Sequence, residues 1–233
     1  MLPHSYDSEF FFPETKFISN DVKQLTYPVA VYPRKNIEML LEVAARLGGK
    51  MPIHVTVTGP IIDKSYYSYL LNLCGTLGLT DRVSFLDGRL TTPQLGQLLR
   101  KTDLVFYPSF QETFGIGIIE TLACGVPVLL PKDIPALNQF LGLDGVWFTE
   151  RSIEASVETA TKILETSGSG HRTLIARGVH DEYSNVEVAR RILLTVKEAF
   201  EIRKLRETLN WEALYENTSY DQMMFSKRGV EHH

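Results

Sequence analysis

Two glutamates, Glu112 and Glu120, are the residues of this sequence with the clearest potential for chemistry. Between them lies Gly115, in a stretch that we expect to lead from a loop into a helix. Backbone N–H groups at the start of a helix attract an anion through their geometry and the helix dipole. Gly115 has no Cβ, so a diphosphate can approach the backbone there. A carboxylate on each side of this cradle can accept hydrogen bonds from sugar hydroxyls, and a ribose diol suits such a group. The pattern therefore predicts a site for a diphosphate with a sugar at each end.

The elements that must position these residues alternate between strand and helix. Apolar runs predict strands at residues 27–32, 53–58, 83–86, 103–107, 126–130 and 145–148, and helical patterns lie between most of them. Such strands, apolar throughout, are typical of a parallel sheet covered on both faces. The fold class that we predict is α/β, a single Rossmann-like, doubly wound parallel sheet followed by a helical tail. In such sheets ligands bind beyond the carboxyl ends of the strands, where residues 108–120 are expected.

The chain divides into four predicted parts. Residues 1–26 read as an irregular segment that enters the domain, and residues 27–200 as the sheet domain. Two helices are expected between residues 153 and 200, separated by a glycine-rich break at residues 167–170. Residues 201–229 form an amphipathic helical tail with Trp211 and Leu214 on its apolar face, and residues 230–233 are typical of a purification-tag remnant.

Composition excludes several classes of protein. The 233 residues include 24 Lys+Arg and 28 Asp+Glu, for a net charge of −4, which argues against a nucleic-acid partner. Cys74 and Cys124 lie in apolar contexts without metal-ligand spacing, so we expect reduced thiols and a cytoplasmic protein. No run approaches the ~18 apolar residues of a membrane span, and no signal peptide is expected. The histidines show no ligand spacing either, so no metal site is predicted.

Taken singly, each candidate residue has a plainer explanation. A glutamate in the first turn of a helix often serves only as a dipole partner, and glycines often serve packing. Lys35, in the loop after the first expected strand, is by itself a solvated loop charge. Only the conjunction of motifs in order favours a functional site.

That conjunction resembles the donor-binding, carboxyl-terminal domain of family 4-type glycosyltransferases, the group 1 glycosyl transferases with the two-domain GT-B fold. Glu112 and Glu120 match the hallmark of two glutamates with seven residues between them. The resemblance covers about residues 3–200. The other matching stretches are Arg82-Val83-Ser84-Phe85-Leu86-Asp87-Gly88, Tyr107-Pro108-Ser109, Gly125-Val126-Pro127-Val128 and the early segment Tyr6-Asp7-Ser8-Glu9-Phe10 with Pro13.

The resemblance implies a role for each site residue. Glu112 would contact the transferred sugar and stabilise positive charge at its anomeric carbon, and Lys35 would pair with the diphosphate as its bond to the sugar breaks. Glu120 would accept the ribose hydroxyls. Substrate-binding roles are implied as well for the cradle residues Thr113, Phe114, Gly115 and Ile116, for Arg89 and Leu90 near the base, and for Arg34 beside Lys35.

By the same resemblance, the function is retaining transfer of a hexose from a nucleotide diphosphate sugar, without metal or cofactor. The partners implied are the sugar-nucleotide donor and an amino-terminal acceptor domain that this chain lacks; peripheral association of the intact protein with a membrane stays open. One departure is that Val29 and Ala30 stand where the family has a Gly-Arg pair. This departure keeps a second hypothesis open, a sugar-nucleotide-binding module without activity. A GT-B-type sugar-nucleotide epimerase is a third, less favoured alternative.

Overall fold

The strands of the chain form one parallel sheet. The computed structural model describes residues 4–14, 21–166 and 169–208. In this part of the chain the six strands lie in the order β3-β2-β1-β4-β5-β6, and every neighbouring pair is parallel. The order reverses between β1 and β4, so the predicted doubly wound, Rossmann-like sheet is confirmed. The strands are β1 (Lys23–Pro28), β2 (Ile53–Gly59), β3 (Val83–Asp87), β4 (Leu104–Phe106), β5 (Val128–Pro131) and β6 (Val146–Thr149).

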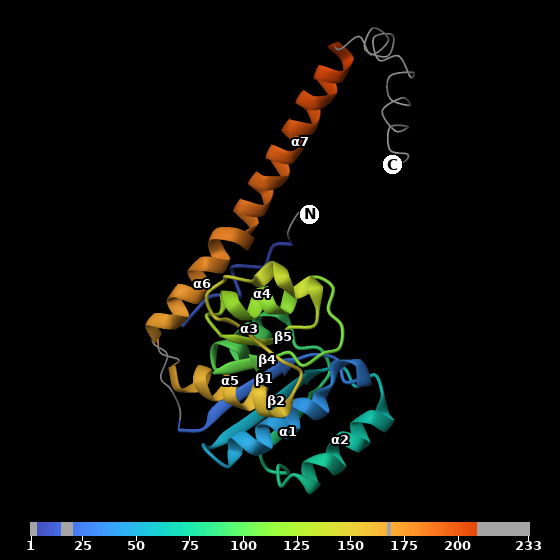
Figure 1. Ribbon diagram of the computed structural model, residues 1–233, viewed down its shortest axis with the longest axis vertical. Helices are drawn as coiled ribbons and strands as arrows, with labels where there is room; N and C mark the ends of the chain where they lie inside the picture. Colours follow the sequence, from blue (N-terminus) through green and yellow to red (C-terminus); the bar gives the residue numbers. More distant parts are fainter. Residues whose placement is uncertain (1–3, 15–20, 167–168, 209–233) are drawn as a thin grey trace, which may run out of the picture. The chain divides into compact units, whose positions relative to one another are not determined.

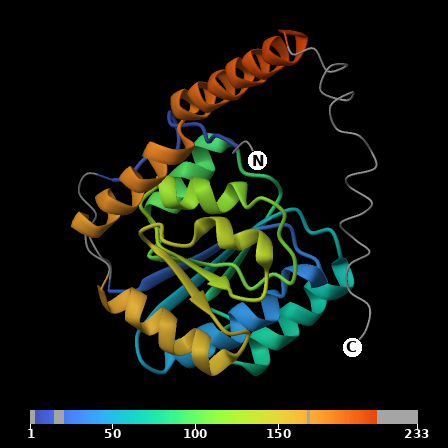
Figure 2. The same cartoon turned by 45° about the horizontal axis from the view of Figure 1, so that its top comes forward.

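Helices cover both faces of this sheet (Figure 1). On one face α1 packs against α2 and α5, and on the other α4 packs against α6, with α3 beside α4 (Figure 2). The helices of these two layers are α1 (Ile37–Gly48), α2 (Lys64–Thr76), α3 (Thr92–Arg100), α4 (Ile116–Ala123), α5 (Ile153–Thr166) and α6 (Ser169–Tyr183). Two short 3-10 helices, η1 (Pro33–Lys35) and η2 (Pro135–Phe140), lie in the loops that follow β1 and β5.

The strand that leads to the two glutamates is fully enclosed. Leu104, Val105 and Phe106 of β4 are all buried, without the alternation of an exposed sheet face. Such continuous burial is typical of a parallel strand with helices on both sides. The loop after β4 therefore starts from a fixed point in the core.

The first strand begins earlier than predicted. β1 starts at Lys23, four residues before the expected position, so residues 1–26 are not all irregular. The predicted start was wrong because the strand begins with two polar residues, Lys23 and Gln24. A tertiary contact holds them, since the Gln24 backbone N–H donates to Asp103 Oδ2 at 2.8 Å. The regular strand ends at Pro28: beyond it the Val29 backbone N–H donates to the Thr58 carbonyl at 2.8 Å, and Val31 forms an isolated bridge with Ile61.

The carboxyl-terminal helices also differ from the prediction. Among the described residues, three helices, not two, follow residue 152, because α6 ends at Tyr183 and α7 (Asn185–Thr208) begins after Ser184. The Ser184 hydroxyl accepts from the Glu187 backbone N–H at 3.4 Å, a start signal that the sequence contains. The boundary expected at residue 200 lies inside α7. The chain divides instead into a compact unit of residues 3–188 and a second unit from Ala189 on.

The predicted tail lies outside the described residues from position 209 on, and this part includes Trp211 and Leu214. Residues 230–233 lie outside them as well. Among those that are described, no helix, the 24-residue α7 included, combines the length and apolar character needed to cross a membrane.

Candidate functional site

The loops that follow β1 and β4 meet at the point where the strand order reverses. β1 and β4 are hydrogen-bonded neighbours, so their carboxyl ends lie side by side. The Phe110 backbone N–H donates to the Arg34 carbonyl at 3.0 Å, and the Asn36 side-chain amide donates to the Pro108 carbonyl at 3.0 Å. These bonds fix the β1 loop, which carries Lys35, against the β4 loop, which carries Glu112.

Lys35 and Glu112 form an ion pair across these two loops. Lys35 Nζ lies 2.8 Å from Glu112 Oε1, and the two side chains are only 15% and 17% exposed. The Ser109 hydroxyl donates to the same Oε1 at 2.9 Å, and Tyr27 donates to the Lys35 carbonyl at 3.2 Å. Shielding from water makes such charge-assisted bonds stronger than those on the surface. The site therefore holds a cation and a carboxylate at one fixed position.

A hollow of about 210 Å³ opens beside this ion pair. It brings together six of the residues that the sequence pointed to: Lys35, Glu112, Thr113, Phe114, Gly115 and Ile116. The rest of its lining comes from the ends of β1 and β4 and from the start of α4: Pro28, Val29, Tyr107, Gly117 and Ile118.

The start of α4 forms one wall of this hollow. Gly115 is the N-cap residue, with φ of +80°, a conformation that glycine adopts without strain. A Cβ there would lie 2.9 Å from Ile118 Cδ1 and 3.1 Å from the Phe140 ring. Within the described residues, the backbone N–H groups of Phe114, Gly115 and Ile116 have no acceptor. The wall therefore offers free donors and the positive end of a helix dipole, which together suit an anion.

A second hollow, of about 240 Å³, continues from the first. The two share Pro28 and Val29, and Arg89 and Leu90 line the far side as the sequence suggested. Ala30 also lines it, so this position contributes a methyl group and no charge. The two adjoining hollows are here called the groove, which lies at the end of β1.

Arg34 and Glu120 line neither hollow. The Arg34 guanidinium donates to Gln111 Oε1 at 3.3 Å, in the loop before Glu112. Glu120 is a half-buried residue of α4, and burial raises the pKa of its carboxyl to about 7. Its charge in turn raises the pKa of Tyr107, which burial has already raised. In the part of the chain that the structure describes, no hydrogen bond to the Glu120 carboxylate is found.

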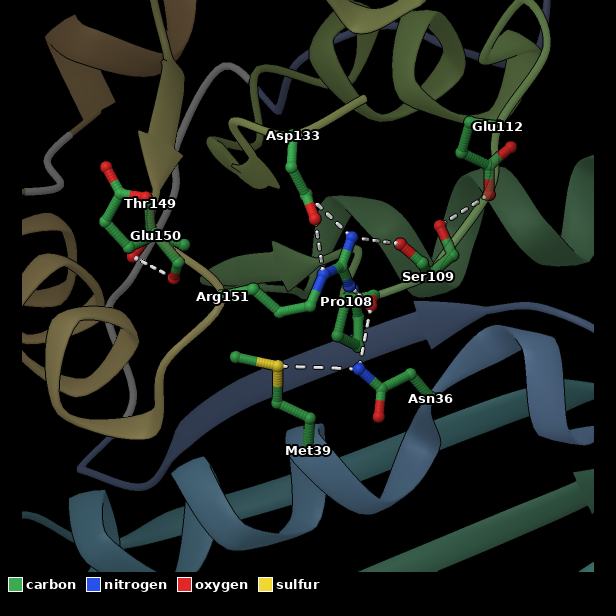
Figure 3. A network of polar contacts seen from close by, with 9 residues as sticks. All are labelled: Asn36, Met39, Pro108, Ser109, Glu112, Asp133, Thr149, Glu150 and Arg151. Atoms are coloured by element: carbon green, nitrogen blue, oxygen red, sulfur yellow. Dashed lines mark hydrogen bonds and ion pairs between the residues drawn. The ribbon is translucent and has the colours of Figure 1, made fainter. Parts of the chain in front are cut away.

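Two residues that hold the site were missed from the sequence. Gln139 in η2 donates to the Phe114 carbonyl at 3.0 Å, and Arg151 donates to the carbonyls of Pro108 and Ser109 (Figure 3). Arg151 follows β6 by two positions, so it also stands beyond the carboxyl end of a strand. Extending the search for site residues to the last strand would have singled it out.

The sequence is similar to those of known glycosyltransferases. A sequence model of the family described as glycosyl transferases group 1 matches residues 9–177. The D-inositol 3-phosphate glycosyltransferase of Salinispora tropica is 30% identical over 195 residues, which cover 78% of this chain and 39% of that protein. The chain thus spans less than half the length of this relative.

Solved structures share the fold. A glycosyltransferase from Rickettsia africae superposes with a TM-score of 0.72 at 17% identity, covering 84% of this chain and 56% of that one. Anabaena Alr3699/HepE in complex with UDP-glucose superposes with a TM-score of 0.63 at 22% identity, covering 83% of this chain and 56% of that one. Since the family's sequence pattern extends over most of the chain and this fold accompanies it, the chain belongs to the family of glycosyl transferases group 1.

Proposed function

We propose that this chain binds a nucleotide diphosphate sugar and serves as the donor half of a retaining hexosyltransferase. The observation that carries the proposal is the placement of the Lys35–Glu112 ion pair in one hollow with the free N–H groups at the start of α4. A diphosphate needs a cation and N–H donors, and a sugar needs a carboxylate that accepts from its hydroxyls. This hollow offers both within a few ångströms. The UDP-glucose in HepE, a protein of the same fold, fits this proposal.

In the proposed complex the diphosphate competes with Glu112 for Lys35. The Lys35 ammonium would turn to the phosphate oxygens and neutralise the charge that grows as the glycosidic bond breaks. Glu112 would keep its bond from Ser109 and turn its second oxygen to the sugar hydroxyls. There its charge would stabilise the positive charge that develops at the anomeric carbon. The same ion pair thus holds both groups ready before the donor arrives.

The nucleoside would occupy the second hollow, with Arg89 and Leu90 near the base. Glu120, which lines neither hollow, would have to turn its carboxylate toward the groove to accept the ribose hydroxyls. A pKa of about 7 leaves this carboxyl partly protonated at neutral pH, and hydroxyl donors would favour its ionised form. Metal and cofactor have no part in this proposal.

Ala30 favours a second candidate function, a sugar-nucleotide-binding module without transfer activity. The groove has no cation at this position, so the diphosphate would depend on Lys35, the α4 N–H groups and Arg34 nearby. Weak stabilisation of the leaving diphosphate would permit binding but slow transfer.

A transfer assay separates the two candidates. The chain alone is expected to give negligible transfer, because half a cleft provides neither acceptor contacts nor exclusion of water. We would mix it with a separately supplied amino-terminal domain of a group 1 glycosyltransferase and with labelled sugar conjugates of UDP, GDP, ADP and TDP. Transfer that is restored on mixing and lost in Glu112→Ala supports the donor domain and eliminates the module. A conjugate that binds without any transfer favours the module.

A further inference from the structure

The side chain of Arg151 is held on one side by Asp133 and on the other by the β4 loop (Figure 3). Its Nε and Nη2 lie 2.8 Å and 2.7 Å from the two carboxylate oxygens of Asp133. Its Nη1 donates to the Pro108 carbonyl at 2.7 Å, and Nη2 also donates to the Ser109 carbonyl at 3.1 Å. All three nitrogens of the guanidinium are therefore used.

The Asp133 carboxylate sets the orientation of this guanidinium. A two-point contact between arginine and a carboxylate fixes the plane of the guanidinium as well as its position. The hydrogen bonds from Arg151 lower the pKa of Asp133, so the pair stays charged at neutral pH. The Arg151 guanidinium carbon lies over the Phe110 ring, 4.9 Å from its centroid.

The β4 loop transmits this anchoring to Glu112. Ser109, whose carbonyl accepts from Arg151, is fully buried, and its hydroxyl donates to Glu112 Oε1 at 2.9 Å. The Pro108 carbonyl accepts from Arg151 and from Asn36 together, so it is held from two sides. A continuous series of contacts thus runs from Asp133 through Arg151 and Ser109 to the carboxylate of Glu112.

We infer that Arg151, oriented by Asp133, is a positioning residue for Glu112, and that it sets how well the site recognises the sugar part of a donor. The inference rests on the proposed function, in which Glu112 contacts that sugar. Arg151 lines neither hollow and contacts the site through the β4 loop, so binding of the nucleoside diphosphate part of the donor should not depend on it.

A neighbouring ion pair provides a matched control. Lys132 and Glu150 are 3.1 Å apart and join the same two loops, those after β5 and β6, but their side chains are 53% and 70% exposed. This pair has no hydrogen bond to Pro108 or Ser109. If the Arg151–Asp133 pair served only to hold these two loops together, loss of the Lys132–Glu150 pair would have a similar effect.

The experiment compares Arg151→Lys, Asp133→Asn and Lys132→Met in the full chain. Arg151→Lys keeps the positive charge but removes the planar guanidinium with its several N–H donors. Asp133→Asn changes an exposed side chain, so it avoids a large loss of packing. The first readout is amide hydrogen exchange of residues 108–113 without ligand. The second is the ratio of the Kd of a nucleoside diphosphate to the Kd of its sugar conjugate, over the UDP, GDP, ADP and TDP series.

We expect Arg151→Lys and Asp133→Asn to speed exchange of residues 108–113 and to reduce the sugar-dependent ratio by about tenfold, the effect of one lost hydrogen bond. The Kd of the nucleoside diphosphate itself should stay within about twofold, and Lys132→Met should behave as wild type. A variant that weakens both ligands equally, or leaves the ratio unchanged, overturns the inference while the proposed function stands. If the wild-type chain binds no donor at all, both fall.

Discussion

Lys35 Nζ and Glu112 Oε1 lie 2.8 Å apart although 76 residues separate them in the chain, and both side chains are largely shielded from water. The contact exists because β1 and β4, after which the two residues follow, are neighbours in the sheet. It places the cation and the carboxylate of the proposed donor site in a single hollow.

Replacing Lys35 by Met should weaken diphosphate binding more than it weakens the fold. The substitution removes a charge-assisted bond to the phosphate, which is typically about 1.5–3 kcal/mol, or about tenfold to a hundredfold in Kd. Calorimetric titration of the variant with nucleoside diphosphates measures the effect.

Arg46→Met is the control for Lys35→Met. Arg46 forms an ion pair with Glu154 at the same 2.8 Å, but both side chains are exposed and neither lines the groove. Its loss should leave the Kd unchanged and cost at most about 1 kcal/mol of stability. Equal effects of the two variants on the Kd would show that only the net charge of the chain matters.

Gly115→Ala should destabilise the fold. A Cβ at this position strains the backbone at φ of +80° and meets Ile118 and Phe140. Gly142 has a similar φ of +86° but open space around it, so Gly142→Ala isolates the backbone strain of about 1–2 kcal/mol. Chemical denaturation should show a larger loss for Gly115→Ala than for Gly142→Ala. Identical losses would mean that the packing around Gly115 adjusts freely.

Glu120→Gln should make stability less dependent on pH. The folded-state pKa of about 7 lies above the ordinary value of 4.5, so this carboxyl contributes fully to stability below pH 4.5, and the contribution is lost as pH rises through 7. At pH 8 the glutamine variant should therefore be more stable than wild type by about 3 kcal/mol, at about 1.4 kcal/mol for each pKa unit between 4.5 and 7. At pH 4 the difference should vanish.

The control for that series is Glu158→Gln. Lys162 lowers the pKa of Glu158, so its contribution is present above the ordinary pKa and lost in acid, the opposite sign. Melting temperatures of the three chains from pH 4 to pH 8 make the comparison. A wild type and a Glu120→Gln variant that follow the same curve would contradict the assigned pKa.

The alternation of strands and helices allowed the sheet and most of the site to be predicted. It placed Lys35 and residues 112–116 beyond strand ends, and parallel strands bring such ends to one edge. Local patterns failed where tertiary contacts decided. Asn36 stands at the N-cap position of α1, as its residue type favours, yet its φ is +51° and its side chain bonds to the Pro108 carbonyl instead of capping the helix.

The place of Arg151 after a strand can be read from the sequence, but its hydrogen-bond partners could not be assigned, for a related reason. Its guanidinium reaches from the end of β6 to the loop after β4, past the intervening strand β5. Local sequence patterns predict where strands lie in the chain, but they do not give the path of each loop. The position of the guanidinium at the end of such a long side chain therefore depends on tertiary packing, which no local pattern describes. The start of β1 was missed in the same way, since Asp103 from a distant segment holds it.

The central claim, that this chain is a sugar-nucleotide donor domain, is tested most directly by a thermal-shift screen. The wild-type chain and Lys35→Met would be heated with UDP, GDP, ADP and TDP and with their hexose conjugates. A ligand at 100 times its Kd adds about 2.7 kcal/mol to stability, which raises the melting temperature measurably. We expect one nucleotide and its conjugate to raise the melting temperature of wild type, with the shift much reduced in Lys35→Met. No shift with any of these ligands would contradict the claim.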